Sequence, residues 1–414
     1  MPRQASPRGG EGRGRHPQRP EHSCRRFGRT CCCKYEVRAG AQIFDRAGGR
    51  LILVGVRIVK VPLNDRSYAI QIGPGLLSQL GRECARLGFG RRCAILTDTN
   101  VGPRFGRRVR QSLQAAGFEP LLITVPAAET AKSLKTVQRC YDQLAAQRLE
   151  RKSFLVALGG GVVGDLGGFV AATYLRGLAF VQVPTTLLAQ VDSSVGGKVG
   201  VNLPAGKNLV GAFHQPRLVV CDLDTLRTLP LREFRAGLAE VIKYGIVYDA
   251  ALFSRLERDL PALLRRAAGP LASVIARCCE IKAEVVSQDE TETGLRAILN
   301  FGHTIGHGLE AISRYGKYLH GEAISIGQVA AARLSARLLG LPQSEAARIR
   351  TLFERAGLPV ALQLNRLQRA RLLTAMQLDK KVSGGQVRFV LAKRIGQAEY
   401  GHVVPAEILS EVLS

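Results

Sequence analysis

The sequence predicts an α/β N-terminal domain built on a parallel sheet, followed by an all-α C-terminal domain. Short runs of apolar and β-branched residues alternate with helical stretches between about residue 56 and residue 230. Several of these runs end in a turn or a glycine cluster, and beyond Pro230 strand-like runs nearly vanish while helical spacing continues. Alternating strands and helices favour a parallel, doubly wound sheet with its ligand site at the carboxyl ends of the strands.

The strands of the first domain are predicted from short apolar runs that are bounded by turns. Helical spacing fills the intervals, as in residues 76–88 and 133–148. The predicted strands lie within residues 56–63, 68–73, 91–100, 120–126, 153–161 and 178–184.

The second domain is predicted from segments with helical periodicity, residues 232–247, 271–288 and 322–340. A chain of 414 residues suits two domains of about 150 to 200 residues each. We therefore assign residues 56–230 to the α/β domain and residues 231–414 to the helical domain. Residues 1–55, rich in Arg, Gly and Pro, are expected to be a disordered extension, a transit peptide or a misassigned translation start.

The formal charge of +26 would suit a nucleic acid or an acidic membrane surface as partner. However, residues 1–60 contain 14 Lys or Arg against 4 Asp or Glu, so much of the excess is concentrated in the N-terminal extension. No apolar run reaches the roughly 18 residues that a membrane span needs. The charge pattern therefore does not favour a nucleic acid partner, and no membrane partner is expected.

The ten cysteines do not form a spaced disulfide or zinc framework, because Cys31, Cys32 and Cys33 are adjacent, as are Cys278 and Cys279. Reduced thiols fit this pattern best, and with them a cytoplasmic location.

Lysine is rare among the basic residues, with 13 Lys against 46 Arg. An ammonium group is not interchangeable with a guanidinium where phosphate or carboxylate must be positioned. We therefore expect such contacts from the lysines in or beside Gly-, Asp- and His-containing stretches, namely Lys132, Lys198, Lys207, Lys243, Lys282, Lys380 and Lys381.

Two glycine-containing stretches predict a ligand site in the first domain. GGGVVGDLGG, residues 159–168, follows a strand and would let backbone amides approach a pyrophosphate, although its spacing differs from G-x-G-x-x-G and tight packing also demands glycine. Asp98 and Asn100 end an earlier strand, where they would hold a ribose or cap a turn. Residues 183–213 combine hydroxyls, Asp192, Lys198, Lys207 and Asn208 in a stretch typical of an ordered ligand loop.

The stretch NFGHTIGHGLE places His303 and His307 one helical turn apart, on one face. Glu240 and His320 are candidates for a further metal ligand. Two histidines and one carboxylate would leave coordination positions open, as catalytic zinc requires. Spacing alone leaves open whether His303 and His307 both bind the ion.

Taken together, the chain closely resembles 3-dehydroquinate synthases from about residue 56 to the C-terminus, in GGGVVGDLGGF, QVPTTLLAQVDSSVGGKVGVN, GKNLVGAFHQP, GLAEVIKYG, KAEVVSQDETETGLRAILNFGHTIGHGLE, LHGEA and LDKKV. The resemblance implies a Rossmann-like NAD-binding domain followed by a helical metal-binding domain. It also implies that NAD and a zinc or cobalt ion assist the conversion of 3-deoxy-D-arabino-heptulosonate 7-phosphate to 3-dehydroquinate and phosphate, a step of the shikimate pathway.

The resemblance also assigns residues to roles. The metal would be held by Glu240, His303 and His320, so that His307 would face the substrate. Arg176 would reach the site of a neighbouring subunit, which implies a homodimer. The substrate would be held by Lys198, Asn208, Lys243, Lys282, Arg296, Asn300 and one of Lys380 or Lys381. We predict the NAD site at Asp98, Asn100, Glu129, Lys132, Gly160, Gly161, Val162, Asp165, Thr185, Thr186, Asp192 and Lys207.

One departure and three alternatives accompany this interpretation. Ala128 stands where the family usually has glycine, which is harmless if its φ is negative. Sister sugar-phosphate cyclases that act on substrates without a carboxylate are the leading alternative, and Lys282, Arg296, Asn300 and His307 argue against them. A nucleic-acid-binding protein and an NAD-dependent polyol dehydrogenase are two further alternatives.

Overall fold

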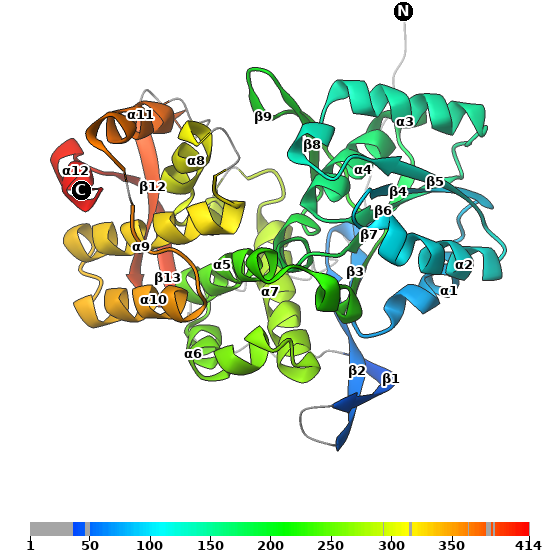
Figure 1. The fold of residues 1–414 in the computed structure, drawn as a ribbon, viewed down its shortest axis with the longest axis horizontal. Coiled ribbons are helices and arrows are strands. Elements are labelled where there is room, and N and C mark those ends of the chain that lie inside the picture. The colour runs from blue at the N-terminus through cyan, green and yellow to red at the C-terminus, as the bar shows by residue number, and fades with distance from the viewer. Residues whose placement is uncertain are drawn as a thin grey trace, which may run out of the picture. The chain divides into compact units, whose positions relative to one another are not determined.

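The structure is a computed structural model that describes residues 36–45, 50–292, 294–313, 317–362, 364–377, 382–383 and 386–413. Residues Tyr35–Ser414 form one compact unit (Figure 1). The chain changes from strands to helices at Leu231, directly after Pro230. The division into two domains at residue 230 remains a prediction, because both halves belong to that unit.

The first half is organised around one eight-stranded sheet. Six neighbouring strands run parallel, as predicted: β3, β10, β7, β6, β4 and β5. Strands β1 and β2 add an antiparallel edge beside β3. In spatial order the strands are β1 (Glu36–Asp45), β2 (Arg50–Val61), β3 (Tyr68–Gly73), β10 (Leu218–Asp222), β7 (Ala179–Pro184), β6 (Phe154–Gly159), β4 (Arg92–Asp98) and β5 (Glu119–Val125).

Strands β1 and β2 differ from the disordered segment expected over residues 1–55. Residues 50–61, RLILVGVRIVKV, are rich in the β-branched and apolar residues that favour strands, and their second half pairs with β3. Residues 36–45 then pair with β2. Residues 1–35 and 46–49 lie outside the described residues.

Helices cover both faces of the sheet, because side chains alternate between its faces along each strand. On β4, Cys93 and Ile95 face one layer, and Ala94 and Leu96 face the other. The first layer contains α1 (Leu80–Ala85) and α2 (Arg107–Ala115). The second contains α3 (Leu134–Ala146), α4 (Gly161–Thr173) and a hairpin of β8 (Lys198–Leu203) and β9 (Gly206–Phe213).

The second half is largely helical, as predicted. Its central helix is α5, which is buried along most of its length and joins the hydrophobic core that also receives β2, β3 and α7. The helices are α5 (Leu231–Val247), α6 (Ala250–Leu264), α7 (Ala268–Gln288), α8 (His303–Ile312), α9 (His320–Leu338), α10 (Gln343–Arg355), α11 (Arg366–Gln377) and α12 (Ala406–Val412).

A small antiparallel sheet was not predicted in this half. It consists of β11 (Val382–Ser383), β12 (Gln386–Arg394) and β13 (Gln397–Val403). Phe389 and Leu391 of β12 pack in a hydrophobic cluster with Ile326 and Leu334 of α9. The sheet therefore packs on the apolar side of α9. It is not a separate layer with a ligand site at its edge.

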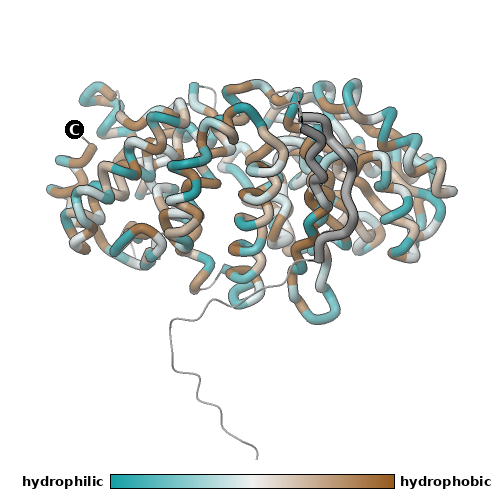
Figure 2. The backbone as a smooth tube through the Cα atoms, turned by 90° about the horizontal axis from the view of Figure 1, so that it is seen from below, coloured by the Kyte–Doolittle hydropathy of each residue, from teal (hydrophilic) through white to brown (hydrophobic). Residues whose placement is uncertain are grey.

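Polar and apolar stretches alternate along the helices and strands (Figure 2). This alternation fits elements that each turn one side toward a core and another toward water. Within the described ranges, no helix combines the length and apolar character that crossing a membrane requires.

Candidate functional site

A large cavity lies at the carboxyl ends of β4, β6 and β7, which meet at one edge because the strands are parallel. Its volume is about 1070 Å³. The cavity brings together every predicted cofactor residue: Asp98, Asn100, Glu129, Lys132, Gly160, Gly161, Val162, Asp165, Thr185, Thr186, Asp192 and Lys207.

The start of α4 is shaped to receive a flat or anionic ligand. Gly160 precedes the helix and Gly161 begins it, and the helix has no side-chain cap at this end. A Cβ at Gly160 would lie 3.1 Å from Thr186, and one at Gly161 would lie 3.2 Å from the Ser193 hydroxyl. The glycines thus keep open a narrow approach to the helix N-terminus, which favours the pyrophosphate of a dinucleotide. NAD fits this cradle.

Hydrogen bonds join the cofactor side of the cavity to the β8–β9 hairpin. Lys132, a buried residue of the cavity wall, donates from Nζ to Asp165 Oδ2 at 2.7 Å and to Asn208 Oδ1 at 2.5 Å. Asn202 of β8 donates to Glu129 Oε1 at 2.8 Å. Ala128 has a φ of −159°, which is extended backbone that alanine adopts freely, so its replacement of glycine carries no strain.

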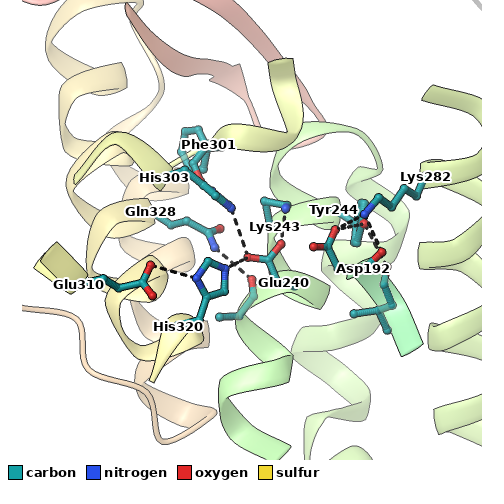
Figure 3. Close-up of polar contacts among 12 residues, drawn as sticks. Asp192, Glu240, Lys243, Tyr244, Lys282, Phe301, His303, Glu310, His320 and Gln328 are labelled. Carbon is teal, nitrogen blue, oxygen red and sulfur yellow. Dashed lines mark hydrogen bonds and ion pairs between the residues drawn. The ribbon is translucent and has the colours of Figure 1, made fainter. Parts of the chain in front are cut away.

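Three predicted metal ligands converge from three helices. Glu240 comes from α5, His303 begins α8 and His320 begins α9 (Figure 3). The Nε2 atoms of both histidines lie 3.7 Å from Glu240 Oε1. The three ligand atoms lie within 4.8 Å of one another. Adjacent ligands of tetrahedral zinc lie roughly 3.4 Å apart for bonds of about 2.1 Å. The cluster therefore has the dimensions of a metal site.

Glu240 gives the strongest indication that this cluster is built for an ion. Its side chain is fully buried, and Oε1 has no hydrogen-bond partner among the described residues. A buried carboxylate oxygen without a partner costs free energy unless a cation compensates it. The other oxygen, Oε2, contacts the Lys243 ammonium. Burial raises the pKa of Glu240, but Lys243 and His320 outweigh this effect and lower it, so Glu240 is held as a carboxylate.

Both histidines are oriented through their second ring nitrogen. His303 Nδ1 lies 3.2 Å from the carbonyl oxygen of Phe301, and His320 Nδ1 lies 3.2 Å from Glu310 Oε2. Metal-binding histidines commonly donate from the non-ligating nitrogen in this way. Burial lowers the pKa of His320, but the carboxylates of Glu240 and Glu310 raise it to about 10, so an ion that binds Nε2 would displace a proton from the ring. Glu310 itself has a pKa lowered to about 2, because hydrogen bonding to His320 overcomes burial.

A second cavity, of about 450 Å³, adjoins the first. Asp165, Asp192 and Asn208 line both cavities. The second cavity also collects three cations that were predicted to hold the substrate: Lys198, Lys282 and Arg296. Cations gathered in one pocket suit a ligand that carries anionic groups.

Buried charges in this pocket are organised around Asp192. Lys282 Nζ donates to Asp192 Oδ1 at 2.7 Å, and Tyr244 donates its hydroxyl to the same oxygen at 3.1 Å. Burial raises the pKa of Asp192, but Lys282 and Lys243 outweigh this effect and lower it strongly. Burial lowers the pKa of Lys282, and that of Arg296 as well. The pocket thus holds its cations against a desolvation cost that an anionic ligand would relieve.

The remaining predicted residues are dispersed. Lys243 lines neither cavity; it is buried, and its ammonium contacts Glu240 Oε2. Asn300 donates to Glu292 at 2.7 Å. His307 lines the larger cavity, its ring centroid 6.1 Å from that of His320. Arg176 is exposed and lines neither cavity. Lys380 and Lys381 lie outside the described residues.

Three residues of the site were missed by the sequence analysis. Glu310 follows His303 and His307 on the same face of α8, a spacing that could have identified it. Glu292 contacts both Lys198 and Asn300, and Asn202 anchors the hairpin to Glu129. Neither of these two carries a sequence signal, because both lie in irregular or hairpin segments.

The fold and its site define the class of sugar-phosphate cyclases. A solved 2-deoxy-scyllo-inosose synthase, complexed with carbaglucose-6-phosphate, NAD⁺ and Co²⁺, matches with a TM-score of 0.79 and 26% identity, over 86% of this chain and 99% of that one. A 2-epi-5-epi-valiolone synthase from Streptomyces hygroscopicus with NAD⁺ and Zn²⁺ bound matches with a TM-score of 0.76 and 29% identity, over 85% and 97%. A glycerol dehydrogenase from Schizosaccharomyces pombe, at 15% identity and a TM-score of 0.60, shares the fold alone.

Within this class, the chain belongs to the 3-dehydroquinate synthase family. Its N-terminal and C-terminal family models match residues 122–236 and 237–382. A 3-dehydroquinate synthase from Nitrosomonas europaea is 51% identical over 361 residues, covering 87% of this chain and 97% of the relative. One from Geobacter metallireducens is 50% identical over 353 residues, covering 85% and 97%. The resemblance seen in the sequence is confirmed.

Proposed function

We propose that the chain is an NAD- and metal-dependent lyase that converts 3-deoxy-D-arabino-heptulosonate 7-phosphate to 3-dehydroquinate and phosphate. The observation that carries this proposal is the buried Glu240 Oε1, which accepts no hydrogen bond from the described residues and faces two histidine Nε2 atoms at 3.7 Å, close to the cavity suited to NAD. Family membership supports the same reaction, since curated relatives with about half of their residues identical are 3-dehydroquinate synthases.

The cofactors would supply chemistry that side chains lack. When bound, NAD would supply a reversible hydride acceptor, and the divalent ion would supply a Lewis acid for a substrate hydroxyl. Glu240, His303 and His320 would hold the ion, and the cavity at the start of α4 would hold NAD. Phosphate elimination, ring opening and intramolecular aldol closure then need a substrate that is held in one orientation.

The protein would supply orientation and charge. Lys282 and Arg296, both buried, would bind the substrate carboxylate in the second cavity. The remaining polar groups and the phosphate of the substrate would be held by Lys198, Asn208, Asn300, His307 and one of Lys380 or Lys381. Lys243 would act through its contact with Glu240, because its ammonium keeps the Glu240 carboxylate ionised.

The assembly and location of the enzyme complete the proposal. Arg176, exposed and away from both cavities of its own chain, would reach the site of a second copy in a homodimer. The segment that presents Arg176 has an uncommon backbone conformation, because φ is positive at Leu175, Arg176 and Gly177. The cysteine pattern supports a cytoplasmic enzyme.

Phosphate release from 3-deoxy-D-arabino-heptulosonate 7-phosphate tests the reaction, with NAD present and Zn²⁺ or Co²⁺ either supplied or removed by a chelator. We expect metal-dependent release without net NADH. Stoichiometric NADH would instead indicate a dehydrogenase, and release only from another sugar phosphate would indicate a sister cyclase. Arg296→Ala should raise KM or lower kcat sharply, and unchanged kinetics would remove the carboxylate assignment.

A further inference from the structure

Glu310 connects a predicted metal ligand to the hairpin that borders the cofactor cavity. It lies on α8, with only 7% of its surface exposed. Its Oε2 lies 3.2 Å from His320 Nδ1, and its Oε1 lies 3.4 Å from Lys207 Nζ. Figure 3 shows its carboxylate on the far side of the His320 ring from Glu240. One buried carboxylate thus contacts both the imidazole and a lysine of β9.

The contact to His320 decides which ring nitrogen faces the metal position. A neutral imidazole carries one N–H and one lone pair. When Nδ1–H donates to a carboxylate, the lone pair remains on Nε2, the atom that lies 3.7 Å from Glu240 Oε1. Glu310 therefore selects the tautomer that can bind an ion beside Glu240.

His303 and His320 differ in how they are held. The His303 side chain is 9% exposed, and its Nδ1 faces a backbone carbonyl, which no substitution removes. The His320 side chain is 30% exposed and begins its helix, so packing constrains it less. Its orientation consequently depends on the side-chain acceptor, Glu310.

We infer that Glu310 is a positioning residue that orients His320 for metal binding and, through Lys207, aligns the β8–β9 hairpin with the metal site. This inference rests on the proposed function, because it takes Glu240, His303 and His320 as the ligands. Glu310 itself binds neither the ion nor the substrate in this scheme.

Metal affinity, measured apart from catalysis, tests the inference. The full-length chain and its Glu310→Gln and Glu310→Ala variants would be titrated with Co²⁺ and Zn²⁺ against a competing chelator. Loss of a partner of this kind typically weakens metal binding about 10- to 100-fold. We expect roughly tenfold weaker binding for Glu310→Gln, which keeps an oxygen acceptor, and a larger loss for Glu310→Ala. The visible absorption bands of bound Co²⁺ should shift, reporting altered ligation.

Two control variants distinguish the orientation of His320 from two other causes of weaker metal binding, the loss of a negative charge and the loss of the hairpin contact. Glu257→Gln removes a carboxylate of α6 that pairs with Arg348 of α10, and it should change affinity less than about twofold. Lys207→Met removes the hairpin contact but leaves the His320 contact, and it should weaken metal binding less than Glu310→Gln does. Circular dichroism would confirm that each variant is folded.

The outcomes distinguish this inference from the proposed function. If the native chain binds metal, His303→Ala abolishes binding and both Glu310 variants bind normally, the positioning role is wrong while the metal site stands. If the native chain binds neither ion, both the metal assignment and the role of Glu310 fail. A Lys207→Met variant as weak as Glu310→Ala would show that the hairpin, not His320, transmits the effect, and would overturn the inference.

Discussion

Replacing Asp192 with asparagine should destabilise the protein by removing the counter-charge of a buried lysine. The Asp192 carboxylate accepts hydrogen bonds from Lys282 and Tyr244, at 2.7 and 3.1 Å. Lys282 has only 6% of its surface exposed, and the pocket also holds Arg296. In Asp192→Asn the shape and one oxygen acceptor remain, but the ammonium loses its compensating charge.

The magnitude follows from the burial of the two partners. Removing one partner of a buried ion pair costs about 3 to 5 kcal/mol. The Asp192 side chain is 26% exposed, and asparagine retains an acceptor, so water and the amide recover part of that cost. We therefore expect a loss of about 2 to 3 kcal/mol in the free energy of unfolding near pH 7.

The loss should shrink as the pH rises. Burial already lowers the pKa of Lys282, and without Asp192 this pKa falls further. Between the folded pKa and the unfolded value of about 10.4, the unfolded chain binds a proton that the folded chain does not, so stability increases with pH. In the native protein Asp192 limits this effect, which makes the difference between variant and native protein pH-dependent.

Urea unfolding of the ligand-free protein at pH 7 and pH 9, followed by circular dichroism, measures both quantities. Asp142→Asn is the matched control, because Asp142 is exposed on α3, where its carboxylate accepts a hydrogen bond from the neighbouring Gln138 side chain. A loss below about 0.5 kcal/mol in Asp192→Asn would refute the reasoning, since that is the range of ordinary surface substitutions. An equal loss at both pH values would refute the role assigned to Lys282.

Three further predictions concern stability and metal. Asp249 caps α6 and pairs with Arg277 at 2.6 Å; burial raises its pKa, but these contacts lower it. Its contribution of about 2 kcal/mol to stability should therefore be present above about pH 4 and be lost as the pH falls through the folded pKa. Acid unfolding of Asp249→Ala beside the native protein would measure this loss. Gly321→Ala should lower the melting temperature markedly, because its Cβ would lie 1.9 Å from the Ala236 carbonyl oxygen, whereas Gly269→Ala, with nothing within 4 Å, should not. Dialysis against a chelator should lower the melting temperature and Zn²⁺ should restore it, except in His303→Ala; a melting temperature indifferent to zinc would contradict the metal assignment.

The parallel sheet and its ligand edge could be predicted, because short apolar runs that end in turns depend only on local sequence. Gly160 and Gly161 follow such a run, and they do lie at the start of α4 in the cavity. The antiparallel edge was harder to recognise, since β1 is stabilised by pairing with β2 and not by an apolar pattern of its own.

The predicted metal ligands could not be chosen from local sequence patterns alone. His303 and His307 occupy one face of α8, so spacing could not choose between them. The choice depends on where α5 and α9 place Glu240 and His320, which is a matter of helix packing. Only the resemblance to a family predicted in advance that Glu240, His303 and His320 would lie together. Glu310 escaped notice because a glutamate in a helix is common, and its importance comes from the residue that it contacts.

Adjacent residues of the β8–β9 hairpin reach opposite halves of the molecule. Lys207 contacts Glu310 of the helical half, while Asn208 receives a hydrogen bond from Lys132 beside the predicted NAD site. A rotation of one half against the other would have to stretch one of these two contacts. We therefore expect the binding of NAD and of the ion to be thermodynamically coupled. If NAD changes the affinity for the ion by some factor, the ion must change the affinity for NAD by the same factor.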